Sequence, residues 1–294
     1  LLIEASEFNW KDVSPAIFGS LFQSVMDREE RRELGAHYTM EENILKLIKP
    51  LLLDELAGEF ERINSRKDKH RISELEKFQD KLANLKFLDP ACGAGNFLII
   101  VYREIRELEL KIIWEIHGKG NQRLDSSILS KVDVDQFYGI EIVEFSARIA
   151  EVSLWMMDHL MNEKLGEKFG EAYVRIPLKK SPNILNADAL EIDWNELLPS
   201  SDCSYVLGNP PYGGSKTVSP EQRDQVRHIA GTGKKGTLDY VAGWFLKATQ
   251  YVNEKTPIGF VATNSITQGE QVEIGGNEKY VPLCRAHFNK KKLK

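Results

Sequence analysis

The residues with the clearest chemical potential form the tetrapeptide Asn209-Pro210-Pro211-Tyr212, which follows a short apolar run at 205–208. Its two prolines donate no backbone hydrogen bond and have a nearly fixed φ, so that the Asn209 side-chain oxygen and the Pro210 carbonyl oxygen can face a common point. Such a pair of acceptors suits a planar NH2 group, and the ring of Tyr212 can stack on the base that carries this group. A plain turn is the competing interpretation.

Two glycines form a second candidate site in the stretch 85–100 (LKFLDPACGAGNFLII). This stretch is a short apolar run that stops at an acid, turns, and restarts as an amphipathic helix. Gly93 and Gly95 can take a positive φ and let a ligand approach the backbone, and the helix that begins near Asn96 directs its free N–H groups at that ligand. The pattern predicts a nucleotide-cofactor loop, with an ordinary tight turn as the alternative.

The residues around this loop favour one cofactor over another. A dinucleotide-binding fold would have a third glycine three positions after Gly95, where this chain has Leu98. Asp89, at the end of the apolar run, is unsuited to a pyrophosphate but suits a cofactor that carries a positive charge. We therefore expect S-adenosylmethionine rather than NAD.

Two further acids follow later apolar runs of the chain. Glu141 stands where α/β folds place a carboxylate that accepts hydrogen bonds from both ribose hydroxyls, and its alternative is a surface acid. Asp188 can accept from the exocyclic amine of the cofactor's adenine, with Ala189 beside the ring, and its alternative is a helix N-cap. Acceptors at Asn209 would then localise the lone pair of a substrate amine toward a sulfonium methyl group.

Each of these candidate residues follows a predicted strand. Apolar runs alternate with helical patterns along the chain, which predicts a parallel, doubly wound α/β sheet of the Rossmann-like type. In such sheets ligands bind beyond the carboxyl ends of the strands, so the acids and the tetrapeptide should share one edge. The expected strands are 85–88, 137–140, 183–188, 205–208 and 258–263, and the expected helices are 97–117, 145–161 and 239–251.

Helical patterns without strands precede this sheet. Thr39 and Glu42 have the spacing of a capping box at the start of a helix. Residues 61–84 are rich in charge and predict an exposed helical linker. Glu109 and Lys111 superficially match the acid and lysine of a nuclease site, but their place within a predicted helix assigns them to the helix surface.

Composition excludes several classes of protein. With 294 residues, a net charge of −5 and a pI near 5.8, the chain lacks the clustered Lys and Arg of a stand-alone DNA binder. Its three cysteines are far apart, which argues against disulfides and a structural zinc, so no metal is expected. No apolar segment approaches a membrane span and no signal peptide is recognisable, which predicts a cytoplasmic protein without a membrane partner.

Three segments carry a resemblance to a known family. Residues 89–97 (DPACGAGNF) and 209–212 (NPPY) resemble the cofactor and catalytic motifs of amino-directed, adenine-N6 DNA methyltransferases. Residues 35–39 (GAHYT) resemble the segment that touches the methionine end of the cofactor in the gamma-type motif order. The wider stretches 32–39 and 263–271 are similar to the methyltransferase region of MmeI-like type IIL restriction-modification enzymes.

The resemblance implies the site residues and the partners. The tetrapeptide would be catalytic, and no metal would be required. The cofactor-binding residues would be Tyr38, Thr39, Asp89, Ala91, Gly93, Gly95, Asn96, Glu141, Ile142, Asp188 and Ala189. The substrate would be a flipped adenine in double-stranded DNA, held through a target-recognition domain not evident in this sequence, and a nuclease domain would belong to the intact polypeptide.

The resemblance also implies how the chain is divided. We expect a helical amino-terminal extension and connector at 1–80, an S-adenosylmethionine-dependent methyltransferase domain at 81–271, and an atypical, disordered or truncated tail at 272–294, as in a fragment without its recognition domain. Methyltransferases that act on RNA or on a protein glutamine amide use the same tetrapeptide, so they stay as alternatives. A non-catalytic cofactor-binding fragment is the alternative from another class.

Overall fold

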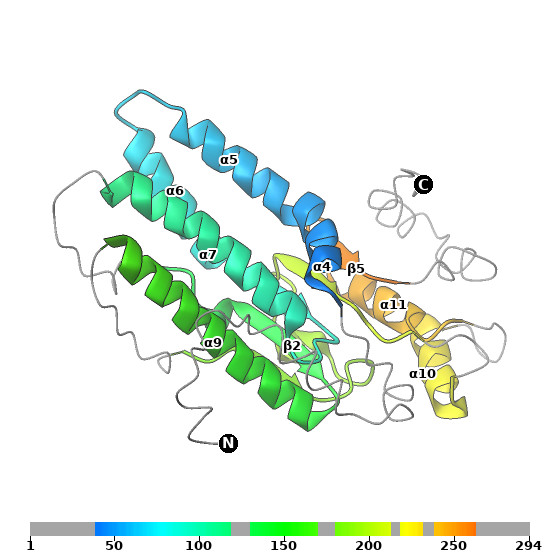
Figure 1. Ribbon diagram of the computed structural model, residues 1–294. Coiled ribbons are helices and arrows are strands. Elements are labelled where there is room, and N and C mark those ends of the chain that lie inside the picture. Colours follow the sequence, from blue (N-terminus) through cyan, green and yellow to red (C-terminus); the bar gives the residue numbers. More distant parts are fainter. Residues whose placement is uncertain (1–38, 119–129, 170–179, 213–217, 232–237, 263–294) are drawn as a thin grey trace, which may run out of the picture.

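A parallel five-stranded sheet forms the centre of the computed structural model, which describes residues 39–118, 130–169, 180–212, 218–231 and 238–262 (Figure 1). The strand order is β3-β2-β1-β4-β5, and every neighbouring pair is parallel. The strands are β1 (Phe87–Asp89), β2 (Phe137–Glu141), β3 (Asn183–Asn186), β4 (Tyr205–Gly208) and β5 (Ile258–Phe260). The predicted doubly wound α/β fold is confirmed.

Long helices connect the parallel strands, as crossover connections require. Helix α7 (Asn96–His117) follows β1, and α9 (Glu144–Phe169) follows β2 and extends beyond the predicted end at 161. Helices α10 (Pro220–Ala230) and α11 (Ala242–Tyr251) lie between β4 and β5. Short 3₁₀ turns, η3 (Val134–Gln136) and η4 (Trp194–Glu196), precede β2 and β4.

The alternation of side chains along the strands divides the core into two layers. Phe87 and Leu207 pack with the helices on one face of the sheet, in a cluster that includes residues of α7 and α9. Their neighbours Leu88 and Val206 point to the other face, where they pack with residues of α11. Strands buried on both faces are nearly continuous apolar runs, which explains why their positions could be predicted.

Between residues 39 and 86, the described part of the chain before β1, four helical elements pack against the first of these layers (Figure 1). They are α4 (Glu41–Ile48), the π-helical turn η2 (Lys49–Leu53), α5 (Asp54–Asn64) and α6 (Arg71–Asn84). The expectation of an exposed linker at 61–84 is wrong for α6, because Leu75, Phe78 and Leu82 are buried at helical spacing. Its charged residues cover only the outer side of a core helix.

The predicted capping box at the start of α4 is also absent. Met40 is the N-cap residue, and no side-chain hydrogen bond caps this helix. The helix begins with the carbonyl oxygen of Met40, which accepts hydrogen bonds from the N–H groups of Asn43 and Ile44. The hydroxyl of Thr39 therefore does not cap this helix.

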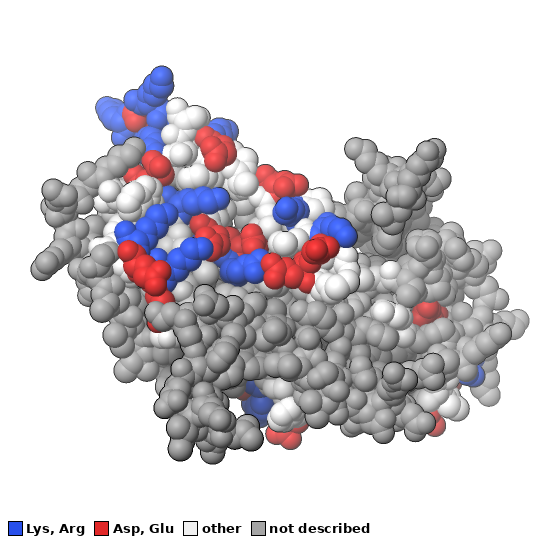
Figure 2. Space-filling view, in the orientation of Figure 1, with Lys and Arg blue, Asp and Glu red and all other residues white. Residues whose placement is uncertain are grey.

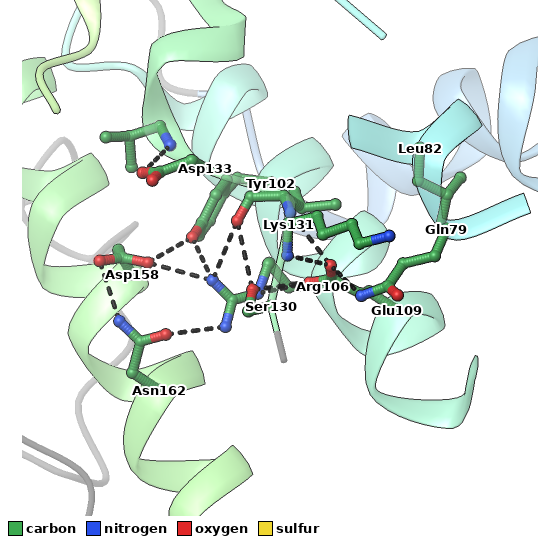
Figure 3. Close-up of polar contacts among 12 residues, drawn as sticks. Gln79, Leu82, Tyr102, Arg106, Glu109, Ser130, Lys131, Asp133, Asp158 and Asn162 are labelled. Carbon is green, nitrogen blue, oxygen red and sulfur yellow. Dashed lines mark hydrogen bonds and ion pairs between the residues drawn. The ribbon is translucent and has the colours of Figure 1, made fainter. Parts of the chain in front are cut away.

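A buried ionic network lies between α7 and α9 (Figure 3). The guanidinium of Arg106 donates to Asp158 Oδ1 over 3.1 Å and to Asn162 Oδ1 over 2.8 Å. The assignment of Glu109 to the helix surface is wrong, since its side chain is fully buried and pairs with Arg106. Its carboxylate accepts from the backbone N–H groups of residues 131 and 132, at 2.6 and 3.0 Å, and so holds the segment that leads into β2.

The exposed face of α5, α6 and α7 carries interspersed charges of both signs (Figure 2). Ion pairs join Lys81 to Glu59 and Lys77 to Glu74 there, each between partly exposed side chains. Exposed pairs of this kind contribute little to stability. Among the described residues, none of the helices combines the length and the apolar character needed to cross a membrane.

Candidate active site

The candidate residues gather where the order of the strands reverses. From β1 the chain builds outward through β2 to β3, whereas β4 returns to the other side of β1 and β5 follows it. Asp89 is the last residue of β1, and Asn209 directly follows β4. The carboxyl ends of two adjacent strands with diverging connections form the usual crevice for a ligand in an open α/β sheet.

The glycine loop between β1 and α7 has the predicted backbone conformation. Gly93 has a φ of 55° and Gly95 a φ of 84°. A Cβ at Gly95 would also lie 3.0 Å from Cβ of Ala150, so this glycine lets the loop pack closely on α9. Helix α7 starts directly afterwards at Asn96, and its first N–H groups are directed toward the same edge of the sheet.

Asp89 is a buried acid with one oxygen unused. Its Oδ1 atom accepts a hydrogen bond from the N–H of Ala91 over 3.0 Å, while Oδ2 is buried and has no partner among the described residues. Burial raises the pKa of Asp89 to about 8, and the nearby carboxyl of Glu141 adds to this rise. A ligand with a positive charge or with N–H donors would satisfy this carboxyl group.

Glu141 ties the end of β2 to the glycine loop. Its Oε2 atom accepts from the N–H of Gly93 and its Oε1 atom from the N–H of Val143, each over 2.9 Å. The side chain is therefore built into the site and is not a detached surface acid, and burial raises its pKa. The next side chain, Ile142, is 59% exposed at the same edge, where it offers an apolar surface.

Asp188 follows β3 and is held from two sides. Its Oδ1 atom accepts from the N–H of Leu190, and its Oδ2 atom accepts from Nε2 of Gln225 on α10, both over 2.8 Å. The oxygen of the Gln225 amide accepts in turn from the hydroxyl of Tyr240. The alternative of an N-cap applies in part, because Asp188 Oδ1 caps a single turn whose N–H groups at Glu191 and Ile192 donate to the Asp188 carbonyl, but no helix follows.

Asn209 has a divided hydrogen-bonding pattern. Its Nδ2 atom donates to Oγ1 of Thr39 over 2.9 Å, across 170 positions of sequence. Its Oδ1 atom is buried and without a partner in the described part of the chain. Pro210 is buried, and both Pro211 and Tyr212 are half-buried. The predicted site residue Tyr38 lies outside the described residues.

The structure thus brings most of the predicted residues to one edge of the sheet. Direct contacts connect the residues of the glycine loop with Glu141, and the close approach of β4 to β1 places Asn209 near Asp89. Three buried side-chain oxygens lack partners among the described residues, and all three lie at this edge: Asp89 Oδ2, Asn96 Oδ1 and Asn209 Oδ1. Buried acceptors of this kind are uncommon, and they suit a ligand rich in N–H donors and positive charge.

Several residues of the site had no signal in the sequence. Gln225 reaches Asp188 from α10, and Tyr240, in the turn before α11, donates to Gln225. The indole N–H of Trp244 donates to the carbonyl of Pro90 over 3.1 Å. The partnership of Thr39 with Asn209 was equally unforeseen. Within the described residues no three His, Cys, Asp or Glu side chains cluster in a way that could hold a metal ion.

Comparison with known proteins gives consistent matches over nearly the whole chain. Residues 62–284 match the family described as the DNA-methyltransferase domain of MmeI. The chain is 40% identical over 301 residues to DNA methyltransferase A of Bacillus subtilis (strain 168), with 100% of this chain and 33% of that protein covered. The fold is similar to that of the type IIL restriction-modification enzyme MmeI in complex with DNA, with a TM-score of 0.86, 50% identity, and coverage of 95% of this chain and 36% of that chain.

A more distant structure has the same fold. The DrdV–DNA complex gives a TM-score of 0.52 at 17% identity, with 91% of this chain and 24% of that chain covered. The present chain spans about a third of the length of the two more similar proteins.

Proposed function

The chain belongs to the family of MmeI DNA-methyltransferase domains, and from that premise we propose that it transfers a methyl group from S-adenosylmethionine to the N6 amino group of an adenine in double-stranded DNA. The proposal of a planar amine as the methyl acceptor rests on the hydrogen bonding of the Asn209 side-chain amide. Its nitrogen is occupied by Thr39, while its buried oxygen has no partner among the described residues. An acceptor held in this way is suited to an N–H group of a substrate.

The cofactor is assigned to the edge formed by β1, β2 and β3. Asp89 can pair with the positive charge at the methionine end, since its Oδ2 atom is buried without a partner among the described residues. Glu141 would accept from the ribose hydroxyls, and Ile142 and Asp188 would contact the adenine ring and its amine. Gly93 and Gly95 keep the backbone open to the cofactor, and Ala91, Asn96 and Ala189 complete this surface.

The reaction is a direct displacement. S-adenosylmethionine, when bound, supplies the methyl group as a sulfonium electrophile. Asn209 Oδ1 and the Pro210 carbonyl oxygen accept hydrogen bonds from the two N–H groups of the target amine. This directs the nitrogen lone pair at the methyl carbon. Tyr212 stacks on the base. The new N–C bond forms as the S–C bond breaks, and the surplus proton of the amine leaves to water, because amide oxygens are too weakly basic to retain it.

A base inside a duplex cannot present its amine to this edge, so the target adenine must leave the helical stack. Unstacking costs a few kcal/mol, which contacts elsewhere on the DNA must offset. We assign the choice of the target sequence to parts of the intact polypeptide beyond this chain, where a nuclease domain is also expected.

The test is to identify the product. The intact polypeptide is incubated with radiolabelled S-adenosylmethionine and, in separate arms, mixed-sequence duplex DNA, structured RNA, and glutamine-containing peptides. Nucleosides from the DNA arm are then identified by mass spectrometry. We expect label in N6-methyladenine; label in N4-methylcytosine would refute the base assignment, and label only in RNA or in glutamine would refute the substrate.

Asn209→Ala separates catalysis from cofactor binding. We expect transfer to fall by at least about 100-fold, since a precisely placed polar group at a reacting centre is lost. Calorimetry should find nearly unchanged affinity for S-adenosylmethionine. Asn84→Ala is the matched control, because Asn84 is exposed at the end of α6 and its side chain donates to the carbonyl of Asp80. Loss of both properties in Asn209→Ala would refute the assigned role.

A further inference from the structure

Thr39 contacts the catalytic tetrapeptide directly, although it lies 170 positions earlier in the chain. Its side chain is 8% exposed, and its Oγ1 atom accepts the hydrogen bond that Nδ2 of Asn209 donates. The hydroxyl takes no part in capping α4, whose N-cap is Met40. This contact is therefore the role of the hydroxyl that the structure describes.

Thr39 is held in place by the docking of α4. Ile44 and Ile48 of this helix are buried in the core, and Glu41 forms an ion pair of 2.7 Å with Arg103 on α7. The helix also packs closely on β5, since a Cβ at Gly259 would lie 3.0 Å from Cδ2 of Leu47. A hydroxyl at the start of such a helix has little freedom to move, so it can fix the group that it contacts.

The orientation of the Asn209 amide decides what the site can bind. An asparagine amide has a donor end and an acceptor end of nearly the same shape, and a rotation of 180° exchanges them. With Nδ2 engaged by Thr39, the free end is the acceptor Oδ1, which is buried and has no partner among the described residues. With the amide reversed, two N–H donors would face the N–H bonds of an incoming amine, and binding would be repulsive.

We propose that Thr39 is a positioning residue that holds the Asn209 amide with its oxygen toward the substrate amine. This inference rests on the proposed function and deepens it, because it assigns to Thr39 a role in catalysis in place of contact with the cofactor. The hydrogen bond orients the acceptor before the substrate arrives, so its loss should lower the rate of transfer without weakening cofactor binding.

Thr39→Val and Thr39→Ser form the central pair of variants. Valine keeps the shape of threonine but cannot accept a hydrogen bond, whereas serine keeps the hydroxyl. For the intact polypeptide we expect Thr39→Val to lower kcat about tenfold, the change that loss of one hydrogen bond supports, with the Kd for S-adenosylmethionine unchanged within about twofold. Thr39→Ser should restore most of kcat, and Thr39→Ala serves as a second removal if the valine variant folds poorly.

A second measurement does not depend on activity. Hydrogen exchange of the Asn209 side-chain amide, followed by NMR in the ligand-free protein, should be slow in the wild type and in Thr39→Ser, and faster in Thr39→Val. Thr256→Val is the matched control. Thr256 is buried just before β5, at the amino-terminal ends of the strands, and its hydroxyl donates to the Cys203 carbonyl over 3.1 Å. Its loss should change stability but neither kcat nor the exchange at Asn209.

The outcomes separate this inference from the proposed function. A raised Kd for S-adenosylmethionine with unchanged kcat would overturn the inference and make Thr39 a cofactor contact. Wild-type kcat and wild-type amide exchange in Thr39→Val would overturn it as well. If the wild-type polypeptide methylates no adenine, the proposed function fails, and the exchange experiment alone then decides whether Thr39 orients Asn209.

Discussion

Gly208 leaves room for the carboxyl group of Asp89: a Cβ at position 208 would overlap its Oδ1 atom and lie 2.9 Å from its Cγ atom. The two residues end neighbouring parallel strands, and Gly208 directly precedes Asn209. One glycine thus separates the acid assigned to the cofactor from the amide assigned to the substrate amine. The short distance between the two halves of the site depends on the missing side chain.

Gly208→Ala should damage the cofactor site and the fold together. The added methyl group must displace either the Asp89 carboxyl or the end of β4. The backbone φ of 153° at position 208 is also unfavourable for alanine. We expect a loss of about 2–4 kcal/mol in unfolding free energy, in the range of overpacked cores plus backbone strain. Urea unfolding measures the loss, and calorimetry with S-adenosylmethionine should detect weaker binding.

Gly231→Ala is the control for this variant. Gly231 also has a positive φ, of 64°, at the end of α10, but a Cβ there would meet nothing within 4 Å. It should therefore show only the cost of the backbone conformation, about 1 kcal/mol. Equal losses in the two variants would mean that the contact with Asp89 is unimportant.

The buried carboxyl of Asp89 should make cofactor binding depend on pH. Burial raises its pKa to about 8, so near neutral pH the ligand-free protein favours the protonated form. A cationic ligand needs the carboxylate, and the proton must leave first. Calorimetry should find that the affinity for S-adenosylmethionine rises between about pH 6 and pH 8, by at most about tenfold per pH unit, with proton release on binding.

The same shift predicts the sign of a stability change without ligand. The folded state retains a proton that the unfolded chain loses above about pH 4, so this contribution to stability is full at low pH and is lost as the pH rises toward 8. Asp89→Asn should flatten both profiles and weaken cofactor binding. The exposed acid Asp202 has its pKa lowered by a hydrogen bond from Lys86, so Asp202→Asn should change stability only in the acid range and leave both profiles unchanged between about pH 6 and pH 8. A steep affinity profile that persists in Asp89→Asn would assign the proton to another group.

The parts of the fold that sequence could predict are those set by local pattern. Strands buried on both faces are short apolar runs, and the chain between them has helical periodicity. The predicted ends of β2 and β4 therefore lie within one residue of the observed ends, and those of β1 within two. The glycine loop was predictable because positive φ values at Gly93 and Gly95 follow from residue type. The edge of the sheet at which the acids meet followed from the parallel order alone.

The remaining features depend on contacts between distant segments. The Thr39 hydroxyl matched a local capping pattern, yet its partner is Asn209. The charge-rich helix α6 conceals a buried face, and Glu109 was assigned to the surface because a charged residue in a helix is usually exposed. No periodicity could indicate that Gln225 reaches Asp188. Tertiary packing, and not local preference, decided each of these cases.

Glu141→Ala should weaken cofactor binding in two ways. The variant removes the proposed acceptor for the ribose hydroxyls, and it releases the N–H groups of Gly93 and Val143 that now donate to the carboxylate. We expect affinity for S-adenosylmethionine to fall roughly 10- to 100-fold, the range for hydrogen bonds to a charged group. Glu144→Ala, at a strongly exposed acid three residues later, is the matched control. Unchanged affinity in the Glu141 variant, measured by calorimetry, would refute the ribose role.

Glu109→Ala should destabilise the fold without touching the site. The variant leaves Arg106 buried with one carboxylate fewer. It also removes the acceptor for the N–H groups of Lys131 and Val132, which donate to Glu109. Breaking a buried ion pair of this kind costs about 3–5 kcal/mol, which urea unfolding would measure.

Lys111→Ala is the control for this variant, since Lys111 is exposed and lies two residues along the same helix; it should change stability by about 0.5 kcal/mol or less. Because Glu109 lies more than three helical turns from Asn96, the folded fraction of the variant should bind S-adenosylmethionine with wild-type affinity. Equal stability of the two variants would show that the segment before β2 is held by contacts other than Glu109.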